Sequence, residues 1–130
     1  MSHRVLVVDD EPLVLELTAS MLAELGCDVI TADDGMEALA KIDEDDSIEV
    51  MITDINMPGM NGFELADTAQ RRHPRLRILV CSGSPFFIEN LPPSLQQQVA
   101  FLQKPFVPKM LADAVQNLLQ ERPGAIQPPR

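Results

Sequence analysis

Five short apolar runs of strand length alternate with helix-patterned segments along this 130-residue chain. The central run, residues 50–52, has few polar interruptions and leads to Asp54, which is typical of a strand buried on both faces in a parallel sheet. Pro58-Gly59 and Asn61-Gly62 are turn dipeptides, so the chain must leave the sheet just after Asp54. The runs predict strands at residues 4–8, 27–32, 50–54, 76–81 and 99–102.

The segments between these runs carry apolar residues at helical spacing. Residues 12–25 place Leu13, Leu17, Met21 and Leu25 four apart, and Val14 and Leu22 widen this stripe, which we expect to face the core. Gly26 follows as a helix stop. Further helices are expected over residues 36–42, with Met36, Leu39 and Ile42 inward, and over 62–72 and 108–120. In the segment 84–98, prolines at 85, 92 and 93 predict a short or distorted fourth helix.

Repeated strand-helix units predict an α/β fold with one parallel sheet, because each crossover is right-handed and returns the chain to the same sheet. We expect a doubly wound (βα)5, flavodoxin-like three-layer sandwich with strand order 2-1-3-4-5. This order places the first and third strands side by side. The fold is expected to occupy residues 1–120, and the proline-rich residues 121–130 are expected to form a disordered tail.

Polar side chains stand at the end of four predicted strands. Asp9 and Asp10 follow the first strand, Asp54 ends the third, Ser82 follows the fourth, and Lys104 follows the fifth. A lone aspartate at such a place is usually a turn or cap residue. The carboxyl ends of parallel strands meet at one edge of the sheet, however, so we expect these groups to gather there.

Three carboxylates this close repel one another, by about 4 kcal/mol per pair at 4 Å in an effective dielectric of about 20, unless they take up protons or a cation. An all-oxygen ligand set favours Mg²⁺. A carboxylate can also act as a nucleophile and form an aspartyl-phosphate, with Lys104 and Ser82 binding the phosphoryl oxygens. The acidic run 43–46 is instead expected to be a solvated loop, on the far side of the sheet from Asp54.

Composition restricts the partners and the compartment. The net charge of -10 argues against nucleic acid or an anionic membrane as the main partner. Cys27 and Cys81 lack metal-ligand spacing and are interpreted as core thiols in a reducing compartment. The sequence shows no signal-peptide core and no apolar run long enough for a membrane helix, so a cytoplasmic location is predicted.

Four segments together resemble the receiver domain of two-component response regulators, a CheY-like fold. They are Val7-Val8-Asp9-Asp10-Glu11, then residues 53–62 (TDINMPGMNG), Val80-Cys81-Ser82-Gly83, and residues 101–106 (FLQKPF). The resemblance covers residues 4–120. The last two segments resemble the receivers at the carboxyl end of hybrid histidine kinases, and a single-domain regulator is an equal alternative.

The resemblance implies that Asp54 accepts phosphate from the phosphohistidine of a histidine kinase or a histidine phosphotransfer protein. It implies a Mg²⁺ site made by Asp10, Asp54 and the backbone carbonyl of Asn56, with Asp9 acting through water. In the same family pattern, Ser82 binds the phosphoryl group, Lys104 forms its ion pair, Phe101 is the switch aromatic, and the Lys104–Pro105 peptide is cis. Such a domain is a signalling protein rather than an enzyme, apart from its own phosphorylation and dephosphorylation, and the family allows a homodimer.

A Mg²⁺-dependent phosphatase of the haloacid dehalogenase type is the alternative, since it also uses an aspartate nucleophile at a strand end. That class normally needs a second aspartate two residues later as a general acid, and Asn56 stands there. A flavin-binding flavodoxin is a third alternative. It lacks support because the chain has no Trp or Tyr to stack on the flavin and no phosphate-cradling loop after the first strand.

Overall fold

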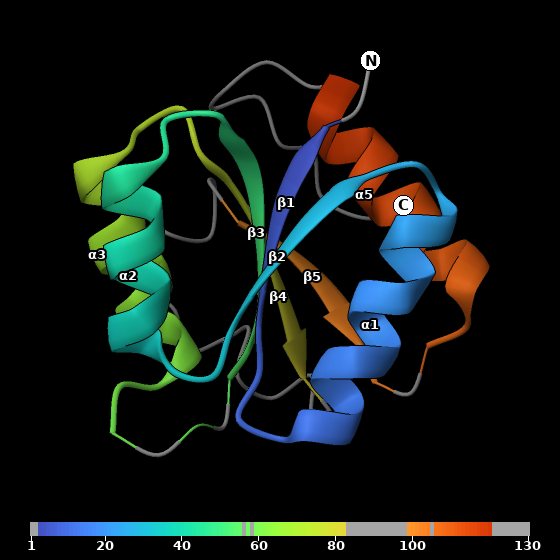
Figure 1. The fold of residues 1–130 in the computed structure, drawn as a ribbon, viewed down its shortest axis with the longest axis horizontal. Coiled ribbons are helices and arrows are strands. Elements are labelled where there is room, and N and C mark those ends of the chain that lie inside the picture. Colours follow the sequence, from blue (N-terminus) through green and yellow to red (C-terminus); the bar gives the residue numbers. More distant parts are fainter. Residues whose placement is uncertain (1–2, 56, 58, 83–98, 105, 121–130) are drawn as a thin grey trace.

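The computed structural model describes residues 3–55, 57, 59–82, 99–104 and 106–120. Its core is a five-stranded parallel sheet with the strand order β2-β1-β3-β4-β5 (Figure 1). The predicted α/β class and strand order are therefore confirmed. The strands are β1 (Arg4–Val8), β2 (Asp28–Ala32), β3 (Ile48–Asp54), β4 (Arg77–Ser82) and β5 (Val99–Gln103).

Among the described helices, α1 and α5 cover one face of the sheet and α2 and α3 cover the other (Figure 1). Their bounds are α1 (Pro12–Glu24), α2 (Gly35–Glu44), α3 (Gly62–Arg72) and α5 (Pro108–Gln120). Within the described ranges, no helix has the length and apolar character needed to span a membrane. The predicted fourth helix and the predicted tail lie outside the described residues.

Alternation along the strands divides the interior into two apolar clusters. In β1, Leu6 and Val8 pack with α2 and α3, whereas Val5 and Val7 pack with α1 and α5. Each of these four side chains is buried. Burial on both faces explains why the strands have the continuous apolar runs seen in the sequence.

The predicted inward stripe of α1 is only partly right, because Leu22 is buried and Met21 packs against the same cluster, but two of its leucines are exposed. Leu13 is 81% exposed and Leu17 is 59% exposed, and the buried residues of this helix are Leu15, Thr18 and Leu22. The helix is apolar on most of its circumference, so the sequence allows more than one inward face. The face that is buried contains a threonine, Thr18. The exposed leucines therefore form a surface, which we call the α1 apolar stripe (Leu13 and Leu17).

Two expectations for α2 also need correction. Met36 is 69% exposed, whereas the predicted Leu39 and Ile42 are buried together with Ala38, and the helix begins one residue earlier than expected, at Gly35. The helix continues to Glu44, so the first half of the acidic run 43–46 is helical rather than loop. Asp43 accepts hydrogen bonds from Arg72 and pairs with His73, both at 2.8 Å, which ties the end of α2 to the end of α3.

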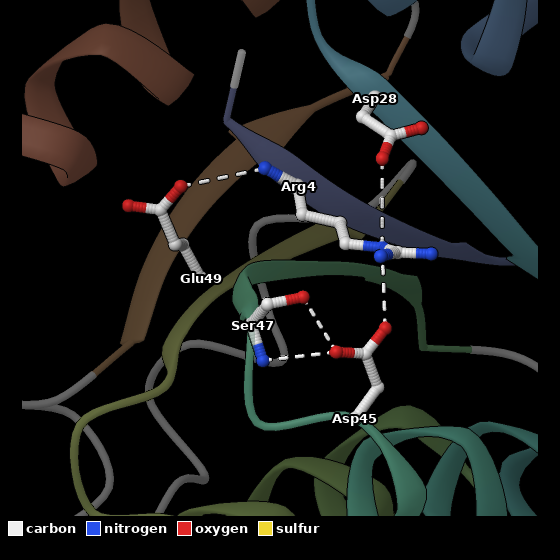
Figure 2. A network of polar contacts seen from close by, with 5 residues as sticks. All are labelled: Arg4, Asp28, Asp45, Ser47 and Glu49. Atoms are coloured by element: carbon white, nitrogen blue, oxygen red, sulfur yellow. Dashed lines mark hydrogen bonds and ion pairs between the residues drawn. The ribbon is translucent and has the colours of Figure 1, made fainter. Parts of the chain in front are cut away.

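The edge of the sheet where the strands begin is held by a network around Arg4 (Figure 2). The Arg4 guanidinium lies 3.6 Å from Asp28 on β2 and 3.2 Å from Asp45 in the α2–β3 loop. Asp45 also accepts a 2.9 Å hydrogen bond from the backbone of Ser47. The Arg4 N–H donates to Glu49 at 3.3 Å. These contacts join three chain segments at the edge opposite Asp54.

Candidate functional site

Five predicted site residues lie at the ends of strands, at the same edge of the sheet. They are Asp9, Asp10, Asp54, Ser82 and Lys104. Asp9 and Asp10 follow β1, Asp54 is the last residue of β3, Ser82 is the last of β4, and Lys104 follows β5. The parallel register aligns these strand ends, since Val8 pairs with Thr53 and Ser82 pairs with Gln103. The expectation that the strand order would collect these residues is met by the backbone.

Three carboxylates form one cluster at this edge. Asp9, Asp10 and Asp54 each offer an oxygen, and these oxygens lie within 4.8 Å of one another. Asp9 is buried, Asp54 is partly buried and Asp10 is exposed, so the cluster is open to solvent on one side. This all-oxygen set, with no nitrogen or sulfur ligand among its members, fits a hard cation such as Mg²⁺.

Lys104 bridges two of the carboxylates. Its Nζ lies 3.4 Å from Asp54 Oδ1 and 3.5 Å from Asp9 Oδ2. The Lys104 N–H donates to the Ser82 carbonyl at 2.7 Å, which fixes the backbone of this residue against the end of β4. Burial alone would lower the pKa of the Lys104 ammonium, but the Asp54 and Asp9 charges outweigh burial and raise it. The ammonium is therefore held in its charged form.

Two backbone hydrogen bonds fix Asp9, one to its own N–H and one to its side chain. Its N–H donates to the Ala32 carbonyl at 3.2 Å, and its Oδ1 accepts the Glu11 N–H at 3.0 Å. Burial raises the pKa of the Asp9 carboxyl above its ordinary value, and the nearby Asp54 and Asp10 charges add to this. The Glu11 N–H and Lys104 oppose the rise but do not cancel it. A cation would relieve this strain on the charged form.

Asp54 presents its carboxylate at the end of the central strand. Its Oδ1 accepts the Ile55 N–H at 2.8 Å, and the side chain is 14% exposed. The buried Cys81 lies beside it, and burial raises the pKa of that thiol to about 12. Cys27 and Cys81 are both free thiols, and Cys27 is only partly buried. Cys81 is thus an un-ionised neighbour rather than a competing nucleophile.

Other predicted site residues are placed less completely. Ser82 is 5% exposed at the end of β4. Phe101, in β5, is half-buried and packs against the cluster that includes the α2 and α3 side chains. Asn56 and Pro105 lie outside the described residues, so the predicted carbonyl ligand and the predicted cis peptide stay predictions.

Two residues beside Asp54 were not predicted as site residues, although both lie in the segment 53–62 that resembles the family. Thr53 is fully buried and its hydroxyl donates to the Asp54 carbonyl at 2.9 Å. Gly62 packs against the same peptide, which the sequence had indicated only as part of a turn. The sequence did contain a sign of this contact at Gly62. Asn61 caps the helix with a capping box, so the first helical residue does not need to be glycine, and a glycine there indicates a close approach.

The comparisons with known proteins agree with this arrangement. The pattern of the response regulator receiver domain matches residues 5–116. Chemotaxis protein CheY1 of Helicobacter pylori (strain J99 / ATCC 700824) is 33% identical over 122 residues, which cover 89% of this chain and 96% of that protein. The solved structure of Vibrio cholerae chemotaxis protein CheY4 has a TM-score of 0.81 at 31% identity, over 91% of this chain and 99% of that one. The receiver domain of the hybrid histidine kinase CckA has a TM-score of 0.76 at 33% identity, over 90% and 99%. The chain belongs to the response regulator receiver domain family.

Proposed function

We propose that this chain is a phosphoryl-accepting signalling switch, which takes phosphate from a histidine kinase or a histidine phosphotransfer protein onto Asp54 and thereby changes its partner binding. The observation that carries the proposal is the position of Asp54. It ends the central strand within 4.8 Å of two further carboxylates and 3.4 Å from the Lys104 ammonium. A partly exposed carboxylate in this setting can meet a phosphorylated partner.

In the transfer, an Asp54 oxygen forms the new O–P bond while the P–N bond of the phosphohistidine breaks and its electron pair returns to the imidazole nitrogen. The Ile55 N–H and Lys104 both contact Oδ1, which favours Oδ2 as the attacking oxygen. Lys104 is charged and already faces the cluster, so it can bind a phosphoryl oxygen without a large rearrangement. The Ser82 hydroxyl is proposed as a second phosphoryl ligand.

Asp10 and Asp54 are proposed as direct Mg²⁺ ligands, with the Asn56 carbonyl, while Asp9 acts through water. When bound, Mg²⁺ would neutralise the carboxylates and the charge of the incoming phosphoryl group. Asp9 is suited to an outer role because the Glu11 N–H and Lys104 already occupy its oxygens. The chain's own contribution is to keep three carboxylates and one ammonium fixed at a single edge.

Mass spectrometry after incubation with acetyl phosphate and Mg²⁺ tests the proposal. The wild-type chain should gain one phosphoryl group, and Asp54→Asn should gain none. Asp46→Asn is the matched control, because Asp46 is an exposed aspartate in the loop before β3, at the opposite edge of the sheet, and it should be labelled like the wild type. Equal labelling of Asp54→Asn would overturn the assignment, and steady turnover of a phosphomonoester would favour the phosphatase alternative.

A further inference from the structure

The peptide that joins Asp54 to Ile55 is contacted on several sides. The Asp54 carbonyl accepts the Thr53 hydroxyl at 2.9 Å, and the Ile55 carbonyl accepts the Gly62 N–H at 2.9 Å. The Ile55 N–H points at two acceptors, Asp54 Oδ1 at 2.8 Å and the Cys81 carbonyl at 3.3 Å. The position of this peptide therefore determines how the N–H is shared between the Asp54 side chain and β4.

Gly62 leaves no room for a side chain against this peptide. A Cβ at Gly62 would lie 2.2 Å from the Asp54 carbonyl oxygen and 2.8 Å from the Ile55 Cα. These are backbone atoms of the central strand end, so they cannot turn away as a flexible side chain can. Backbone conformation is not the reason for the glycine, because Gly62 is not among the described positive-φ residues, Gly26 and Gly59. The requirement is close approach.

Helix α3 cannot easily move back to make that room. Asn61 caps its first turn, accepting the N–H groups of Phe63 and Glu64 at 2.9 Å, while Glu64 reaches back to the Asn61 N–H. Leu65, Ala66 and Ala69 of the same helix are fully buried against the sheet. Gly62 thus presses a fixed helix start against a fixed strand end.

Thr53 makes the complementary contact from inside the sheet. Its side chain lies between Val8 and Val80 in the strand register, and it is 0% exposed. Valine has nearly the same shape as threonine without the hydroxyl, so the bond to the Asp54 carbonyl is what distinguishes Thr53 from an apolar residue at this site. This is a polar group in an apolar cluster with one evident task.

We infer that Gly62 and Thr53 are positioning residues that hold the Asp54–Ile55 peptide in place and, through the Ile55 N–H, orient the Asp54 carboxylate for phosphoryl transfer. The inference rests on the proposed function of Asp54. A displaced peptide would move the Ile55 N–H away from Asp54 Oδ1. The carboxylate would then lose the hydrogen bond that fixes its rotamer.

Two pairs of variants test this. In Gly62→Ala, the peptide must move by about 1 Å, and a misplacement of that size lowers a rate by on the order of 100-fold. Gly35→Ala is the matched control, since Gly35 is also the buried first residue of a helix, but a Cβ there would meet only the flexible Met60 side chain. Its labelling by acetyl phosphate should stay within about twofold of wild type.

The second pair separates positioning from packing. Thr53→Val keeps the shape and removes the donor, and its labelling should slow by on the order of fivefold, the worth of one hydrogen bond. Thr53→Ser keeps the donor and removes a methyl group, so it should label at nearly the wild-type rate although its melting temperature falls. Thr53→Ser should therefore be labelled faster than Thr53→Val, although Thr53→Ser should have the lower melting temperature of the two. Rates that follow the melting temperatures would overturn the inference.

Amide exchange of Ile55, measured without phosphate donor or Mg²⁺, keeps this inference separate from the proposed function. Exchange should be faster in Gly62→Ala and Thr53→Val than in wild type, and unchanged in Gly35→Ala. If wild type is not labelled at all, the proposed function fails, whatever the Ile55 amide does. If wild type is labelled but both the Ile55 exchange and the Thr53→Val rate are unchanged, the positioning role is wrong, and this holds even if Gly62→Ala does not fold.

Discussion

Asp10 is the most exposed of the three clustered carboxylates, and removing it tests how the cluster is balanced. Without a cation, Asp10→Ala should be no less stable than wild type, because a like charge leaves the neighbourhood of Asp9 and Asp54. Solvent screens an exposed charge, so the expected gain in unfolding free energy is only ~0.5 kcal/mol. With Mg²⁺, the variant should bind at least about 10-fold more weakly, since a direct ligand is lost.

Thermal melts in EDTA and in Mg²⁺ measure both effects. Asp46→Asn is the control, because it removes one negative charge from the far edge and should leave Mg²⁺ binding unchanged. A lower melting temperature of Asp10→Ala in EDTA would contradict the repulsion argument. Unchanged Mg²⁺ affinity would contradict the ligand assignment.

Asp43 offers a second residue-level test, away from the site. The hydrogen bond from His73 is the main cause that holds the pKa of the Asp43 carboxyl below 3.8, and Arg72 adds to it. A carboxyl with a depressed folded-state pKa contributes stability above pH 3.8, and this contribution is lost as the pH falls through the depressed value. In His73→Leu, which removes the hydrogen-bond donor, an NMR titration should find the pKa of Asp43 closer to 3.8.

Asp45 is the internal control for that titration. The side chain and backbone of Ser47 lower the pKa of Asp45, and His73 is not among the causes. The pKa of Asp45 should therefore stay low in His73→Leu. A parallel rise at both aspartates would mean that the substitution had disturbed the α2–β3 loop as a whole.

Single residues were predicted well where chemistry marks them and poorly where only space does. Asp9, Asp10, Asp54 and Lys104 could be predicted to gather because each ionisable group directly ends or follows a strand. The role of Thr53 and Gly62 beside Asp54 depends on interatomic distances below 3 Å, which no pattern of residue types encodes. Arg4 is a further example. Its place in the sequence indicates only an ordinary first residue of a strand, but its side chain joins three chain segments.

At the scale of elements, the strands were predicted correctly, whereas the buried face of helix α1 was predicted only in part. Strands buried on both faces need continuous apolar runs, so their location survives any choice of face. Helix α1 has apolar residues on several sides, and the rule that the leucine-rich stripe faces inward was only partly right. The buried face instead contains Thr18, and the α1 apolar stripe remains on the surface.

The α1 apolar stripe is expected to contact the phosphate donor. It begins three residues after Asp10, and the only charged residues of α1 are Glu16 and Glu24, so it suits a partner with apolar side chains flanked by basic ones. Leu13→Ser combined with Leu17→Ser should slow phosphotransfer from a phosphorylated histidine kinase by about 10-fold or more. Labelling by acetyl phosphate should not change, because that donor needs no docking surface.

Met36→Ser is the matched control for the stripe. Met36 is also an exposed apolar side chain at a helix start, 69% exposed, but it lies on α2, across the sheet from α1. Its transfer rate from the kinase should stay near that of wild type. If the Leu13/Leu17 variant lost both donors equally, the stripe would be needed for the fold of the site rather than for docking.

For the whole molecule, the strand order followed from chain connectivity and handedness, and the site followed from the strand order. Strands β1 and β3 are neighbours, which brings Asp9 and Asp10 to Asp54 across the switch in winding direction. Charge balance at the scale of the chain predicts that the main partner is not anionic, since the net charge is -10, and this stays a prediction. Which surface responds to phosphorylation depends on packing. Phe101 packs against one of the two apolar clusters, whereas the buried side chains of α5 belong to the other.

Phosphorylation is expected to act on the β4–β5 side of the site while α5 stays nearly still. Ser82 should move toward the phosphoryl oxygens, and the half-buried Phe101 ring, two residues before Gln103 in the neighbouring strand, should turn into the vacated space. A hydrogen bond from a hydroxyl to a charged phosphoryl group is worth about 1.5 to 3 kcal/mol, which shifts a two-state equilibrium by roughly 10- to 150-fold. The coupling should therefore be partial.

Helix α5 is anchored by Leu111, Val115 and Leu118, each at most 2% exposed in the cluster that it shares with α1, whereas Phe101 packs against the other cluster. A change at Phe101 is thus expected to act on the α2 and α3 side of the sheet more than on α5. Amide exchange with and without beryllofluoride and Mg²⁺ should change most at Ser82 and around Phe101. The largest change in α5, or none around Phe101, would show that the signal leaves the site by another route.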